Sequence, residues 1–216
     1  ISVEKLGLSQ MYIEMFTAVN KAVIDYIESP NYRDPYGYAH IQRIITLIHK
    51  LFKAHEDDDW VRNVDPIVMY LAGLVHEVGG PHSIRSDDDF RDHEDIMRDF
   101  LKQHECIDPR VYAATAFVAS RVSLARELNE PEEMKGEAEA YAALRIVQDA
   151  VRLDGLGAIG LACCFEATEE IDFNIFQKSL ELMKTNKGRE LAFERVQFME
   201  RFRKHWAEET DCSSVL

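Results

Sequence analysis

Apolar residues recur at intervals of three and four along almost the whole chain, the spacing that gathers them on one face of an α-helix. The first such segment ends at about Ser29, before Pro30, and the next runs from Ile41 to Phe52. No segment shows the strict alternation of apolar and polar residues that is typical of a β-strand. The pattern therefore predicts an all-α fold.

Local signals divide this pattern into separate helices. Asp-Pro pairs at residues 65–66 and 108–109 each place a capping carboxylate before a proline, which is favoured in the first turn of a helix. The run Gly-Gly-Pro at residues 79–81 predicts the end of the third helix. Because no repeat or low-complexity linker divides the chain, we expect a single domain over residues 1–216, a bundle of eight or nine helices.

The charge and cysteine content restrict the partners of the chain. A formal net charge of −14 argues against a nucleic-acid surface and against binding to an anionic membrane. The four cysteines, at residues 106, 163, 164 and 212, include no CxxC pair and suggest free thiols in a reducing compartment. We therefore expect a cytoplasmic protein that acts on a small molecule, without nucleic acid or membrane, and that could form a homodimer.

Polar residues with catalytic or metal-binding potential fall at the ends of apolar helical segments. His76 and Glu77 close the buried run LAGLVHEVGGPH, and His40 opens the preceding helix in AHIQRI. A later helix, RIVQDAVRLDGLGAIGLACCF, sets Asp149 and Asp154 in apolar surroundings. Histidines and carboxylates that converge from different helices are how helical bundles build metal or acid–base sites.

These three segments resemble the HD-domain superfamily of metal-dependent phosphohydrolases, in its compact single-domain branch. The resemblance runs from about residue 9 to residue 206 and is strongest in RIVQDAVRLDGLGAIGLACCF. It implies an all-α bundle with the site at its centre. It also implies a metal site built from one histidine, an adjacent His-Asp pair and a distant aspartate.

The match to this metal site is incomplete. The first histidine corresponds to His40, and the pair corresponds to His76 and Glu77, so that Glu replaces Asp. The distant aspartate corresponds to Val151, which has no lone pair to offer a metal. This branch of the superfamily often carries a His-Asp pair where residues 36 and 37 are Tyr and Gly. The scaffold is therefore similar while several of the functional positions differ.

Three hypotheses follow for the function. The first is a metal-independent enzyme without cofactor, an isomerase, cyclase, dehydratase or lyase in which His40, His76, Glu77 and Tyr36 act as general acid and base on an apolar substrate. The second is a phosphohydrolase in which His40, His76 and Glu77 bind manganese, iron or zinc. An oxygenase with the same three ligands is a variant of it. The third is a binding protein that has lost the chemistry.

Four further residues are candidates for substrate binding: Arg43, Val151, Asp154 and Asp149. Asp154 lies three residues after Val151, roughly on the same helix face, and could supply the missing ligand if the end of the helix bends. Asp149 lies nearly opposite Val151. Both aspartates and Arg43 also have a structural interpretation, in which they hold neighbouring groups in place.

Overall fold

The computed structural model describes residues 1–33, 37–84, 89–167 and 172–213. A short 3-10 helix, η1 (Val3–Leu6), precedes the α-helices of these ranges, which are α1 (Gln10–Ile27), α2 (Gly37–Ala54), α3 (Pro66–Val75), α4 (His93–Lys102), α5 (Pro109–Ala119), α6 (Leu124–Asn129), α7 (Pro131–Ala140), α8 (Ala142–Asp154), α9 (Gly157–Ala167), α10 (Asn174–Glu181) and α11 (Asn186–Thr210). Apart from one isolated bridge between Tyr32 and Ser83, no β-structure occurs in the described ranges. The prediction of an all-α fold is confirmed.

The predicted number of helices, eight or nine, is too small, because the described part of the chain has eleven α-helices. The periodicity predicts one helix from Asp108 to about Leu128 and another from Glu137 to Leu153, and the structure breaks both. Ser123 starts α6 by accepting a hydrogen bond from the backbone of Arg126, after a short connection from α5. Tyr141 adopts an extended conformation, φ −121° and ψ 96°, and separates α7 from α8. Apolar spacing continues across both breaks, so it does not reveal them.

The helix α3 forms the centre of the molecule, and every residue from Ile67 to Val75 is buried. It packs against α1, α2, α5 and α8. Asp65 caps its first turn by accepting a hydrogen bond from Ile67 N, as the Asp-Pro signal predicts. A helix that is apolar all round can be stable only when other helices surround it. The last turn of α3 therefore places the two residues that follow it, His76 and Glu77, next to the buried core.

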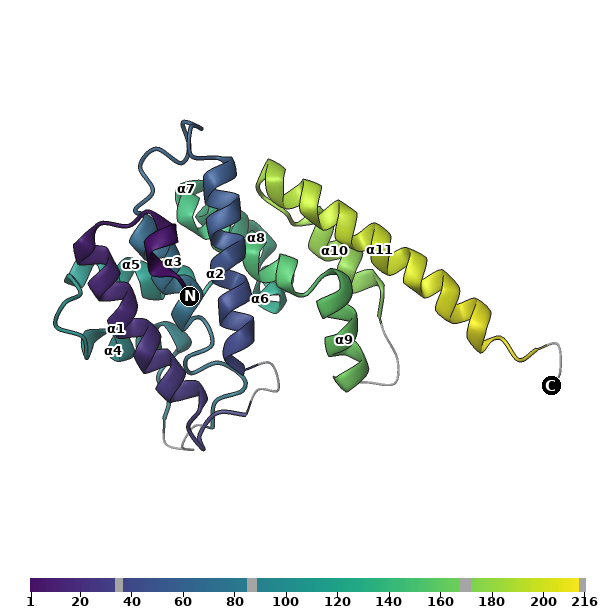
Figure 1. Cartoon of the computed structure of the whole chain (residues 1–216), viewed down its shortest axis with the longest axis horizontal. Helices are drawn as coiled ribbons and strands as arrows, with labels where there is room; N and C mark the ends of the chain where they lie inside the picture. Colours follow the sequence, from purple (N-terminus) through teal and green to yellow (C-terminus); the bar gives the residue numbers. More distant parts are fainter. Residues whose placement is uncertain (34–36, 85–88, 168–171, 214–216) are drawn as a thin grey trace.

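The C-terminal helices lie to one side of the body formed by α1 to α8. Figure 1 shows α9, α10 and the long α11 beside α2, with the end of α11 extending away from the rest of the molecule. The start of α11 is held by Asp149 of α8, which accepts hydrogen bonds from Lys184 N and Thr185 N at 2.9 and 2.8 Å. No helix in the described ranges is both long and apolar enough to cross a membrane.

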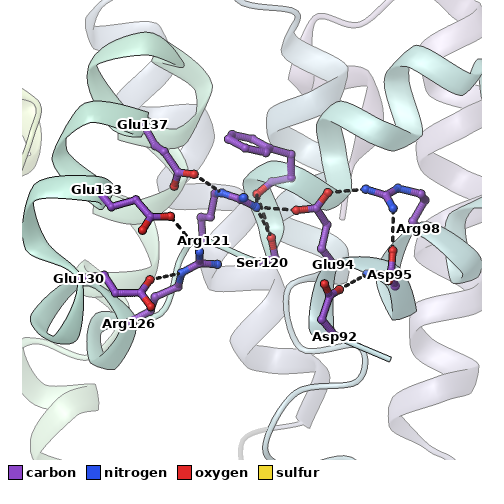
Figure 2. Close-up of polar contacts among 11 residues, drawn as sticks. Asp92, Glu94, Asp95, Arg98, Ser120, Arg121, Arg126, Glu130, Glu133 and Glu137 are labelled. Carbon is purple, nitrogen blue, oxygen red and sulfur yellow. Dashed lines mark hydrogen bonds and ion pairs between the residues drawn. The ribbon is translucent and has the colours of Figure 1, made fainter. Parts of the chain in front are cut away.

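An arginine near the end of α5 joins two helices that are distant in the sequence. Arg121 donates to Glu94 of α4 at 2.6 Å and to Glu137 of α7 at 2.8 Å (Figure 2). Its guanidinium carbon also lies 3.8 Å from the centre of the Phe117 ring, a cation–π contact. This side chain is 14% exposed, so the two ion pairs are largely sheltered from solvent.

Candidate metal centre

The two predicted histidines approach each other from different helices. His40 lies in the first turn of α2, next to Ile41 and Ile44, which are fully buried on that helix. His76 is the C-cap residue of α3 and is 4% exposed, and Glu77 follows it. The packing of α2 against α3 therefore brings together residues that are 36 positions apart in the chain.

Gly73 allows this close approach. A Cβ atom at this position would lie 2.5 Å from Ile48 Cδ1 and 3.0 Å from Ile45 Cδ1, so that the ends of these two side chains would have to move. The carbonyl oxygen of Gly73 also accepts a hydrogen bond from the Nδ1 atom of His76, at 3.0 Å. Position 73 therefore gives room to the α2 isoleucines and, through its backbone carbonyl, orients the His76 ring.

Three ligand atoms converge at this point. The Nε2 atoms of His40 and His76 are 3.0 Å apart. Glu77 Oε1 lies 3.5 Å from the Nε2 atom of His76 and 3.8 Å from that of His40. The three residues form a group whose possible ligand atoms all lie within 4.8 Å of one another. Glu77, at the position where the resemblance implies an aspartate, thus approaches both histidines.

Both imidazole rings are oriented by an acceptor on the Nδ1 side. For His76 that acceptor is the Gly73 carbonyl, and for His40 it is Asp154 Oδ2 at 2.7 Å. A carbonyl and an ionised carboxylate can only accept, so each Nδ1 carries the proton when the ring is neutral. In both rings the Nε2 lone pair then points toward the other ring and toward Glu77.

The ionisation of the surrounding groups agrees with this assignment. Burial lowers the pKa of His76 to about 4, so its ring is neutral at physiological pH. Burial raises the pKa of the Asp154 carboxyl, but hydrogen bonds from His40 and Arg43 outweigh this and leave its pKa below the usual value. Asp154 is therefore ionised, and it lies on the side of His40 that faces away from the neutral His76 ring.

This arrangement fits a divalent metal ion. Two lone pairs 3.0 Å apart repel each other unless a cation lies between them, and Glu77 adds a negative charge to the same point. Ligand atoms about 2.1 Å from one ion lie about 3.0 to 3.4 Å apart in right-angled or tetrahedral geometry. Metal-binding histidines also commonly donate their other N–H to a carboxylate or a carbonyl, as both rings do here.

Arg43 and Asp154, which we predicted as substrate-binding residues, lie directly behind His40. Arg43 donates from Nε to Asp154 Oδ1 at 2.6 Å and from Nη2 to Oδ2 at 2.9 Å. The same Oδ2 atom accepts from His40. Asp154 thus contacts the Nδ1 side of the His40 ring, opposite the point where the three ligand atoms meet.

Two other predicted residues, Asp149 and Val151, are not part of this group. Asp149 is fully buried, and its carboxylate is occupied by the backbone of Lys184 and by the backbone and hydroxyl of Thr185. Val151 is half-buried and packs against the core. Tyr36 lies outside the described residues.

Sequence reasoning missed one residue of the site. The hydroxyl of Tyr32 donates to Glu77 Oε2 at 3.5 Å, on the oxygen that does not face the histidines. Tyr32 is 7% exposed and precedes α2 in a turn-rich connection. Such a connection has no periodicity from which the direction of a side chain could be predicted, so the sequence contains no signal for this contact.

Comparison with known proteins supports the fold. No protein-family model and no curated protein matches the sequence. Among solved structures, Bacillus subtilis YpgQ aligns with a TM-score of 0.67 at 19% identity, over 94% of this chain and 99% of that one. YpgQ in complex with ADP gives 0.62 at 20% identity, over 94% and 98%. An HD-superfamily hydrolase from Bacillus thuringiensis gives 0.60 at 20% identity, over 97% and 98%. At these identities the likeness concerns the fold.

Proposed function

Starting from the HD-domain-like fold of this chain, we propose that it is a metal-dependent hydrolase of a small organic phosphate. His40, His76 and Glu77 would hold one divalent ion of manganese, iron or zinc. The observation that carries this proposal is the 3.0 Å separation of two Nε2 atoms whose rings are both protonated on the opposite nitrogen.

Each residue of the group has a separate role in this proposal. A bound ion would polarise the phosphate and lower the pKa of a coordinated water. Asp154 orients the His40 ring and increases its basicity, while Arg43 keeps the Asp154 carboxylate ionised. The Tyr32 hydroxyl makes a long contact with the outer oxygen of Glu77, and the inner oxygen is the one that approaches the histidines. Three protein ligands leave coordination positions open for water and substrate.

The choice of reaction and substrate rests on the structural neighbours. Two of them are described as HD-superfamily hydrolases, and another, YpgQ, binds ADP in its crystal structure. They favour the hydrolytic hypothesis, and none of them supports the isomerase or lyase of the first hypothesis. A nucleotide or a related phosphate is therefore the substrate class that we propose. Its negative charge would be neutralised locally by the ion, against a chain with a net charge of −14.

Acid–base chemistry without a metal is the second candidate. A single proton shared by the two Nε2 atoms would also remove the repulsion between their lone pairs, and Glu77 Oε1 is close enough to stabilise that charge. Such a protonated pair could donate a proton to a substrate. The two candidates therefore differ in which cation lies between His40 and His76.

Metal content distinguishes these candidates. We would purify the protein without chelator or nickel affinity and measure iron, manganese and zinc by elemental mass spectrometry. We expect about one ion per chain, lost in His76→Ala because only two of the three ligands remain. His205→Ala is the matched control, because His205 lies on α11 with a 70% exposed side chain. It should retain the metal.

Activity is then tested on the metal-loaded protein. We expect phosphate or pyrophosphate release from ATP, dATP or p-nitrophenyl phosphate in the wild type and in His205→Ala, and none in His76→Ala. If neither the wild type nor His205→Ala takes up metal, even after soaking in manganese, iron or zinc salts, hydrolysis by a metal-bound water is ruled out. The protonated histidine pair would then be the site to study.

A further inference from the structure

A groove with a volume of about 590 Å³ lies on the far side of Asp154 from His40. One wall is the outer face of α2, another is the connection from α8 to α9 with the first turn of α9, and the third is α11. In Figure 1 these segments lie where α2 faces the C-terminal helices. The volume falls within the range of about 300 to 1,000 Å³ that is typical of small-molecule pockets.

The lining of this groove combines an apolar surface with positive charge. Leu47, Leu156 and Ile159 provide large apolar contacts. The charged residues of the lining are Arg43, Arg195 and Asp154, two guanidinium groups against one carboxylate. Arg43 pairs with Asp154, and Arg195 donates to the carbonyl oxygen of Leu153. The groove therefore keeps a net positive charge in a protein whose overall charge is strongly negative.

The groove and the candidate metal centre share one carboxylate. Asp154 accepts from Arg43 on the groove side and from His40 Nδ1, at 2.7 Å, on the other side. An anion that contacts Arg43 would weaken the electrostatic attraction between the Arg43 guanidinium and the Asp154 carboxylate. The carboxylate would then accept more strongly from His40 and increase the basicity of its Nε2 atom, which is one of the three ligand atoms.

We propose that this groove is a second ligand site, which binds a small organic anion with an apolar body and thereby strengthens metal binding at His40. The acid group of the ligand would lie against Arg43 and Arg195, and the body against Leu47, Leu156 and Ile159. The prediction that the anion binds depends only on the residues of the groove. The predicted effect of the anion on metal affinity also rests on the proposed function.

The binding step is tested on metal-free protein by isothermal titration calorimetry with 8-anilino-1-naphthalenesulfonate, a sulfonate on an aromatic body. We expect saturable binding to one site per chain. N-phenyl-1-naphthylamine, which has the same rings without the sulfonate, should bind about tenfold more weakly because it cannot pair with the arginines. Arg195→Gln should reduce the affinity for the sulfonate by a similar factor.

A blocking variant locates the site. Thr46 lies on the exposed face of α2 in the lining of the groove, away from the three candidate ligands. Thr46→Trp should fill the groove and abolish binding of the sulfonate. Sulfonate binding that persists unchanged in Thr46→Trp would overturn the proposal, because the probe would then occupy another apolar surface, such as that around Phe165 and Trp206.

The effect on the metal is measured separately, as the affinity for Mn²⁺ in competition with a chelator. Saturating sulfonate should raise this affinity about fivefold in the wild type and leave it unchanged in Thr46→Trp. Mn²⁺ must raise the affinity for the sulfonate by the same factor, because coupling between two sites is reciprocal. Equal Mn²⁺ affinity with and without bound sulfonate would refute the coupling. Sulfonate binding by a protein that takes up no metal would refute only the proposed function.

Discussion

At the scale of single residues, two aspartates of α8 with similar surroundings have different roles. Asp154 supports His40, whereas Asp149 holds the start of α11. We predict that Asp154→Asn weakens metal binding about 10- to 100-fold, the usual effect of removing a carboxylate that supports a ligand histidine. An amide carries no charge to increase the basicity of the ring, and it pairs less strongly with Arg43.

The measurement is chelator competition with Mn²⁺ or Zn²⁺, together with a thermal melt of the metal-free protein. Asp149→Asn is the matched control, because Asp149 lies in the same helix and is also buried. It should lower the free energy of unfolding by about 1 to 3 kcal/mol, because three hydrogen bonds to the carboxylate are weakened, and leave metal affinity unchanged. If both variants lose metal equally, Asp154 has no specific role.

The sequence predicts His40, His76 and Glu77 as a group, because each lies at the end of a buried helical run and in a segment with a specific resemblance. It does not predict the partners that orient the rings. The His40–Asp154 contact joins residues 114 positions apart, and the His76 contact is to a backbone carbonyl. The periodicity of a helix gives the face of a side chain, whereas these contacts depend on how the helices pack.

At the scale of secondary-structure elements, the Arg121 contacts hold α4 and α7 to the end of α5 (Figure 2). We predict that Arg121→Met lowers the free energy of unfolding by about 2 to 3 kcal/mol, because Glu94 and Glu137 are then left partly buried with weaker pairing. Methionine preserves most of the apolar contact with Phe117. Chemical denaturation followed by circular dichroism gives this quantity directly.

Figure 2 also provides the control. Arg126 pairs with Glu130 at 3.0 Å and with Glu133 at 3.7 Å, but these side chains are 32% to 58% exposed. Arg126→Met should therefore change the free energy of unfolding by no more than about 1 kcal/mol. Equal losses in the two variants would mean that burial does not strengthen the Arg121 ion pairs.

Helix starts are predicted better than helix continuity in this chain. Both Asp-Pro signals mark true helix starts, because the carboxylate accepts from the backbone two residues later. The breaks before α6 and α8 fall within continuous apolar spacing and are missed. The helix α4 begins only at His93, and Phe90, which precedes it, is 90% exposed although it is a large apolar residue. Capping depends on neighbouring residues, whereas continuity depends on tertiary packing.

At the scale of the whole molecule, the central position of the site connects its protonation to the stability of the entire fold. His76 follows a helix that is buried on every side, and burial lowers its pKa to about 4 from the ordinary 6.5. In the unfolded chain the ring takes up a proton near pH 6.5, whereas in the folded chain it does so only near pH 4. Acid therefore favours the unfolded state through this residue.

We predict that the metal-free protein loses about 3 kcal/mol of its free energy of unfolding through His76 as the pH falls from 6.5 to 4. The net charge of −14 acts in the opposite sense, because protonation of carboxylates relieves repulsion across the molecule. Urea denaturation in the presence of chelator at several pH values measures the sum of both effects.

The variant His76→Gln separates the two effects, because it keeps the carboxylates and removes the buried imidazole. Its free energy of unfolding should therefore fall less with acid than that of the wild type. The exposed His205→Gln should follow the wild type. Parallel curves for the wild type and His76→Gln would show that the His76 ring does not resist protonation in the folded protein, and that its neutral state is wrongly assigned.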